Sequence, residues 1–99
     1  MERYGTAIEV LSKFIEEKTR IGQGQDKDTA AAYYNRACYK LLRMQQMQGD
    51  EAAKIKDSAY EDLDRAIKQD PDTKIDARAD DDFQVIRQEE RFNLLTGTS

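Results

Sequence analysis

The chain of 99 residues has no histidine, no tryptophan, a single cysteine and a single proline. Without histidine, and with Cys38 as the one thiol, the usual ligands of a tetrahedral zinc site are missing, and no disulfide can form within the chain. Cys38 also falls on a predicted apolar helix face, where burial disfavours the thiolate, and no histidine is present to act as its base. These absences predict a chain without enzymatic activity, cofactor or metal ion.

Long apolar runs and an excess of positive charge are absent as well. No window approaches the ~20 apolar residues that a membrane-spanning helix requires, and the N-terminal residues do not resemble a secretory signal. The 16 Lys and Arg are outnumbered by 20 Asp and Glu, and the net charge of −4 disfavours binding to nucleic acid or to an anionic membrane. A cytoplasmic location is expected, because one unpaired cysteine suits a reducing compartment.

The apolar residues that are present suit closely packed helices. Leu, Ile, Val and Phe total 18, whereas Ala residues number 11 and Tyr residues five. Alanine has the highest helix propensity, and its small side chain lets two helices approach closely. A chain of this length is expected to form one domain, over residues 1–99.

Three segments carry apolar residues at helical spacing, which predicts helices over residues 1–20, 28–48 and 50–70. Asp28 or Thr29 is expected to cap the second helix, because a short oxygen-bearing side chain there can accept a hydrogen bond from the first turn. The predicted stripes are Tyr4, Ala7, Ile8, Leu11, Phe14 and Ile15 in the first helix, Ala31, Tyr34, Ala37, Cys38, Leu41 and Leu42 in the second, and Ile55, Ala59, Tyr60, Leu63, Ala66 and Ile67 in the third.

The remaining chain is expected to be helical too. Asp70 and Pro71 should end the third helix, since the residue before a proline is pushed out of the helical region. Residues 72–97 are predicted to form short C-terminal helices, one at 73–79 and one within 83–95. No segment shows the alternation of a strand, so the predicted fold is all-α and built from antiparallel helical hairpins.

Two parts of the sequence resemble a tetratricopeptide repeat. The spacing of Ala59, Leu63, Ala66 and Pro71 resembles the second helix of that repeat, with small residues where helices cross and a proline after the helix. The run from 33 to 39 resembles the first helix, with Tyr in place of the usual Trp and Ala in place of the usual Gly. The distance between the two parts is about ten residues longer than a repeat of about 34 residues allows.

The resemblance extends to both ends of the chain. The first helix resembles the second half of a preceding repeat. The C-terminal segment resembles an ending seen after the last repeat in some bacterial tetratricopeptide proteins, with Asp81 and Glu90 where prolines are common. The resemblance implies a right-handed helical stack that short C-terminal helices cover. The residues that carry the C-terminal likeness are Phe83, Ile86, Phe92 and Leu95.

The resemblance also implies where a partner would bind. First helices of such repeats line the concave side, so Tyr34, Asn35, Cys38 and Leu41 are the candidate partner-binding residues. Asn35 resembles the asparagine that hydrogen-bonds a ligand in peptide-binding members. A clamp for a terminal carboxylate is not expected, because Ala31 and Tyr34 stand where that clamp has basic residues. The alternative is that Tyr34 and Cys38 simply pack against neighbouring helices.

The expected function is therefore a non-enzymatic adaptor for protein–protein interaction, which binds a protein or peptide partner or a second copy of itself as a homodimer. Self-association is considered because at least three repeats are usually needed for independent stability and this chain has fewer. The alternative is a structural or regulatory fragment of a larger multi-repeat protein or complex.

Charge is spread unevenly along the chain. Residues 1–49 carry 8 basic and 6 acidic side chains, and residues 50–99 carry 8 basic and 14 acidic ones. This asymmetry can orient a partner or a second copy. The alternative is a solvated outer face with i,i+4 ion pairs, such as Glu61–Arg65 and Asp64–Lys68.

Two groups of carboxylates suggest cation sites at first sight. Residues 70–76 have carboxylates two apart, as in a calcium loop, but Lys74 and Ile75 stand where that loop needs a ligand and a glycine. Residues 80–82 are three successive aspartates, and a helix cap explains them more simply than a bound cation.

Overall fold

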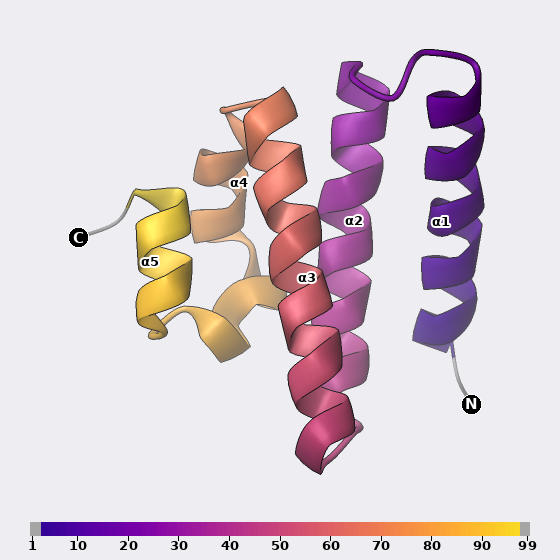
Figure 1. Cartoon of the computed structure of the whole chain (residues 1–99). Helices are drawn as coiled ribbons and strands as arrows, with labels where there is room; N and C mark the ends of the chain where they lie inside the picture. Colours follow the sequence, from indigo (N-terminus) through magenta and orange to yellow (C-terminus); the bar gives the residue numbers. More distant parts are fainter. Residues whose placement is uncertain (1–2, 98–99) are drawn as a thin grey trace.

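The structure is a computed structural model that describes residues 3–97. In this part of the chain every regular element is a helix and no strand is present, which confirms the all-α prediction. The three long helices lie side by side, and the C-terminal elements lie on the side of α2 and α3 away from α1 (Figure 1). The elements are α1 (Arg3–Arg20), α2 (Lys27–Met44), α3 (Gly49–Gln69), α4 (Thr73–Ala79), the 3₁₀-helix η1 (Asp81–Ile86) and α5 (Glu90–Thr96).

The start of α2 differs from the prediction. Neither Asp28 nor Thr29 is the cap: Asp26 is, and its Oδ1 accepts a hydrogen bond from the backbone N–H of Thr29 at 2.8 Å. The other carboxylate oxygen pairs with Lys18 Nζ at 2.5 Å. Lys18 and the two Thr29 hydrogen bonds lower the pKa of Asp26 to about 2. The local sequence pattern does not indicate this cap, because the ion pair that holds the Asp26 carboxylate comes from Lys18 near the end of α1.

The connection between α2 and α3 is longer than predicted. α2 ends at Met44 rather than at 48, and α3 begins at Gly49, whose φ of +64° lies in the left-handed region that favours glycine. The cap of α3 is Gln48, so Asp50 lies in the first helical turn, where its negative charge suits the helix dipole. α3 ends at Gln69, directly before Asp70 and Pro71.

Most of the core lies between α2, α3 and the C-terminal elements. Phe83 and Phe92 reach it from η1 and α5, where they are 0% and 1% exposed. The Phe83 ring centroid lies 5.4 Å from that of Tyr34 on α2 and 5.9 Å from that of Phe92. The other buried members of this cluster are Ala37, Cys38, Leu41, Ala59, Tyr60, Leu63, Ile67, Ala77 and Ile86.

A smaller cluster joins α1 to the hairpin of α2 and α3. Its buried members are Ile15, Ala32, Tyr33 and Ala66, with Leu11 packed against them. Ile15 is the only residue of α1 that is buried. The apolar stripe of α1 is therefore only partly covered.

Replacing Ala66 with phenylalanine is expected to lower the free energy of unfolding by about 1–3 kcal/mol. Ala66 is fully buried on α3, and a larger side chain there must displace its neighbours Ile15 and Tyr33. Urea denaturation followed by circular dichroism measures the change, with Ala53→Phe at an exposed position of α3 as the control. An unchanged free energy of unfolding for Ala66→Phe would contradict this packing.

A buried ion-pair network lies where the three long helices meet. The Asp62 side chain is 4% exposed and accepts two hydrogen bonds from Arg36, Nε to Oδ2 at 2.8 Å and Nη2 to Oδ1 at 2.6 Å. Lys40 Nζ pairs with the same carboxylate at 2.8 Å and donates to Ser58 Oγ at 2.6 Å. Arg36 Nη1 also donates to Ser12 Oγ on α1 at 3.0 Å. The Asp62 carboxylate raises the pKa of the Arg36 guanidinium.

Within residues 3–97, no helix has both the length and the apolar content needed to cross a membrane.

Candidate functional site

The four predicted partner-binding residues do not share one surface. Leu41 is fully buried and Cys38 is 6% exposed, and both belong to the core cluster that α2 forms with α3 and the C-terminal elements. Tyr34 is half-buried, and its hydroxyl donates to Asp80 Oδ2 at 2.7 Å. Asn35 is exposed and lies on the side of α2 that borders α1. Of the four, only Asn35 is therefore placed to meet a partner directly.

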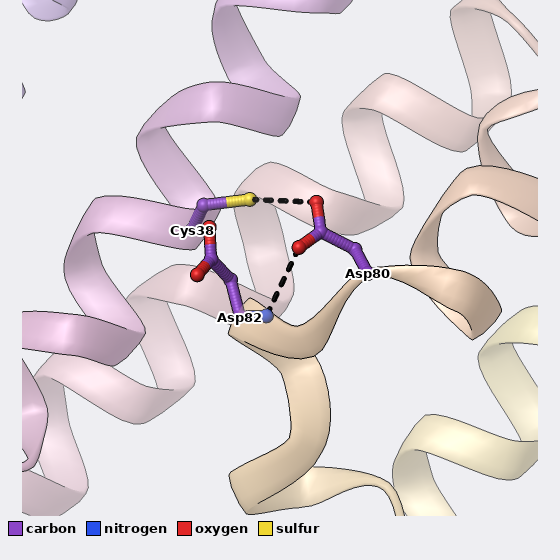
Figure 2. A group of neighbouring side chains, drawn as sticks. All are labelled: Cys38, Asp80 and Asp82. Atoms are coloured by element: carbon purple, nitrogen blue, oxygen red, sulfur yellow. Dashed lines mark hydrogen bonds between the residues drawn. The ribbon is translucent and has the colours of Figure 1, made fainter.

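Tyr34 and Cys38 belong to a polar cluster between α2 and the start of η1. Figure 2 shows Cys38 reaching from α2 toward Asp80 and Asp82. The Cys38 Sγ donates to Asp80 Oδ2 over 4.0 Å, and the backbone N–H of Asp82 donates to Asp80 Oδ1 at 2.9 Å. Asp80 is therefore the cap of η1, as the sequence suggested for this run of aspartates.

The cluster brings together atoms that could hold a metal ion. The Cys38 sulfur and one oxygen from each of Asp80 and Asp82 lie within 4.8 Å of one another. Both oxygens of Asp80, however, already accept hydrogen bonds from the chain, one of them from the Tyr34 hydroxyl. These bonds explain the cluster as a junction that fastens η1 to α2.

Burial and negative charge together control the protonation of this cluster. Burial, then the Asp80 charge, raises the pKa of the Cys38 thiol above its ordinary value. Burial and the hydrogen bond to Asp80 raise the pKa of the Tyr34 hydroxyl. The thiol therefore stays protonated at neutral pH and is a poor nucleophile. Burial, then the charges of Asp80 and Asp81, also raises the pKa of Asp82.

Asp82→Asn is expected to stabilise the fold at pH 7. Because the folded pKa of Asp82 lies above its ordinary value of 3.8, the fold favours the protonated carboxyl. The protonated Asp82 carboxyl therefore contributes stability that is fully present below the pKa of the unfolded chain and is lost as the pH rises through the folded pKa. The asparagine should therefore raise the free energy of unfolding at pH 7 by about 0.5 kcal/mol, and by less at pH 3. Urea denaturation at both pH values measures this, with the exposed Asp72→Asn as control; a loss of stability at pH 7 would refute it.

An exposed hollow of about 430 Å³ lies between α1 and α2. We name it the α1–α2 groove. Two alanines of α2 form part of its lining, and Phe14 of α1 is 42% exposed beside them. Asn35 stands at the groove, and among the described residues nothing engages its side-chain amide. The lining residues are Leu11, Phe14, Asp28, Ala31, Ala32 and Asn35.

The groove combines one predicted site residue with others that the sequence assigned to packing. Leu11 and Phe14 were placed on the apolar stripe of the first helix, and Ala31 on that of the second. The small size of the alanines on α2 that face α1 is the sequence feature that could have identified these groove residues. Side chains as small as Ala31 and Ala32 cannot cover a stripe that contains Leu11 and Phe14, and the uncovered part forms the hollow.

One predicted surface ion pair is replaced by another contact. Asp64 pairs with Lys68 at 2.9 Å, as predicted. Arg65, however, lies over the Tyr33 ring, 5.7 Å from its centroid. Glu61 therefore has no ion pair within the part of the chain that the structure describes. Contact with a buried aromatic ring at the α2–α3 interface outweighs an exposed i,i+4 pair, which contributes little.

A scan of protein-family models, a search of curated proteins and a search of solved structures each give no match to this chain. The tetratricopeptide resemblance thus depends on the residues of this sequence alone, and function must be inferred from the α1–α2 groove and its surroundings.

Proposed function

We propose that the chain is a non-enzymatic protein-interaction module of tetratricopeptide type, and that the α1–α2 groove holds a segment of a partner protein. The observation that carries this proposal is the groove itself, which pairs an apolar lining with an unengaged amide at Asn35. Leu11 and Phe14 would contact apolar side chains of the segment, and Asn35 would hydrogen-bond its backbone. Such a combination of apolar surface and one or two orienting polar groups is typical of peptide-binding sites.

The chemistry of the rest of the molecule supports a binding role over a catalytic one. The chain has no histidine, and its one thiol is buried with a raised pKa. The Asp80 carboxylate beside that thiol accepts hydrogen bonds from Tyr34 on α2 and from the backbone of η1.

Selection of peptides on the natural chain tests the proposal. Peptides from a random library displayed on phage would be selected on the immobilised chain and then measured against Ala31→Trp, which fills the groove from an exposed position. We expect Ala31→Trp to weaken binding at least tenfold. The matched control Ala53→Trp, at an exposed position of α3, should leave binding unchanged. Equal binding to both variants, or no selected peptide at all, would contradict a partner site in the groove.

Sedimentation separately tests the prediction of self-association. At high micromolar concentration, a molar mass of two chains would support a homodimer, whereas a mass of 11.4 kDa would exclude it.

A further inference from the structure

Asp28 gives the α1–α2 groove its charge. Among the described residues that line the groove, it alone is charged, and the others are apolar except for Asn35. The Asp28 side chain is exposed, and its carboxylate has neither an ion pair nor a hydrogen bond within residues 3–97. The sequence suggested Asp28 as a cap of α2, but Asp26 takes that role. The fold therefore leaves the Asp28 carboxylate available to a partner.

Lys18 approaches the groove without neutralising this carboxylate. Its Nζ lies 5.9 Å from the centroid of the Phe14 ring, which lines the groove. The same Nζ pairs with Asp26 at 2.5 Å and donates to Gln23 Oε1 at 3.1 Å, and the Lys18 side chain is 14% exposed. The positive end of the α2 dipole is also offset by the capping carboxylate of Asp26. One end of the groove thus carries a negative charge without a counter-ion.

Asp28 and Asn35 are the first and last residues that α2 contributes to the groove. Because seven residues separate them, close to two helical turns, both side chains leave the same face of α2, about 10 Å apart along its axis. Ala31 and Ala32 lie between them and also line the groove. An extended peptide covers this distance in about three residues. The groove therefore presents a carboxylate, an apolar middle and an amide along a short extended segment.

We propose that the α1–α2 groove selects a segment with a lysine or arginine about three residues from the residue whose backbone bonds to Asn35. The basic side chain pairs with Asp28, and the apolar side chains between the two points lie against Leu11 and Phe14. This inference rests on the proposed function and adds the charge of the partner and the position of that charge. Asp28 is then a specificity-determining residue, because an acidic side chain at the same position is repelled and a neutral one leaves the carboxylate unpaired.

Parallel selections test the proposal. Peptides from a random library displayed on phage are selected on the natural chain, on Asp28→Lys and on Asp50→Lys. Asp50 is the matched control, because it is also an exposed carboxylate in the first turn of a long helix, α3, but does not line the groove. The natural chain and Asp50→Lys should enrich lysine or arginine at one position of the peptide. Asp28→Lys should enrich aspartate or glutamate there instead.

Affinities of two synthetic peptides measure the size of the effect. The peptide most enriched on the natural chain is made with its basic residue and with glutamine in its place. Fluorescence anisotropy should show about threefold weaker binding of the glutamine peptide to the natural chain, and added salt should reduce this difference. Asp28→Asn should bind the two peptides equally, and it keeps the size of the side chain if Asp28→Lys does not fold. Circular dichroism confirms that each variant is folded.

The outcomes separate this inference from the proposed function. If peptides are selected and Ala31→Trp weakens their binding, but basic residues are not enriched or Asp28→Asn keeps the preference, the charge preference is refuted and the groove remains a partner site. Asp28 would then serve only the first turn of α2. If no peptide is selected, or if Ala31→Trp leaves binding unchanged, the proposed function and this inference are both refuted.

Discussion

Asp62→Ala is expected to lower the free energy of unfolding by about 3–5 kcal/mol. The alanine would leave Arg36 and Lys40 without their shared carboxylate, although their side chains are only 18% and 12% exposed. Unpaired charges at such positions lose most of their hydration and gain nothing in return. The free energy of unfolding of a typical domain is about 5–15 kcal/mol, so this loss is large enough to unfold a substantial fraction of the molecules. Urea denaturation at neutral pH measures it.

Two further variants test whether the loss of stability comes from the buried ion-pair network or from the removal of any carboxylate on α3. Asp64→Ala removes a carboxylate from the same helix, but its ion pair with Lys68 is largely exposed, so a change of less than about 1 kcal/mol is expected. Replacing Arg36 and Lys40 by methionine together with Asp62→Leu removes every charge of the network and should recover most of the lost stability. If Asp62→Ala and Asp64→Ala prove equally mild, the buried pairing does not stabilise the junction of the three helices.

Phe83→Ala should cost about 3–5 kcal/mol, because it empties the centre of the main core. The Phe83 ring is fully buried between the rings of Tyr34 and Phe92, and through them it links α2 to α5. The loss should appear first in the C-terminal elements. Thermal unfolding measures the total effect, and the fluorescence of Tyr34 and the other tyrosines reports the change of environment.

The comparison for this variant is Val85→Ala, in the same 3₁₀-helix. Val85 is 44% exposed, so its truncation should change stability by less than about 0.5 kcal/mol. A similar melting temperature for Phe83→Ala and Val85→Ala would show that the C-terminal elements do not complete the core.

The helices could be predicted from the sequence because the patterns that indicate them, apolar spacing and proline, are local. The spacing of Leu11 and Ile15 predicts a helix regardless of what lies beside it, and Pro71 limits α3 through the geometry of its own ring. The packing of Phe83 and Phe92 against α2 and α3 also agrees with the expected C-terminal cover.

The contacts between helices were harder to predict from the sequence. Asp26 rather than Asp28 caps α2 because Lys18 arrives from the preceding helix, and Arg65 turns from Glu61 to Tyr33 because α2 lies beside it. For the same reason, the sequence did not show that the four candidate site residues lie on different surfaces. Consecutive residues such as Tyr34 and Asn35 lie 100° apart around a helix, so a small difference in the placement of α1 decides which of them faces a groove. Pattern alone does not fix that rotation.

The partial cover of α1 has a dynamic consequence. This helix has one buried residue, Ile15, and is otherwise tied to the hairpin by contacts such as Arg36 to Ser12 and Lys18 to Asp26. Its backbone amides should therefore exchange with deuterium through a local opening in which α2 and α3 keep their protection. Because α1 can separate from α2 and α3 at a small free-energy cost, a partner bound to α1 is released with it. We therefore expect short residence times and rapid exchange of bound partners.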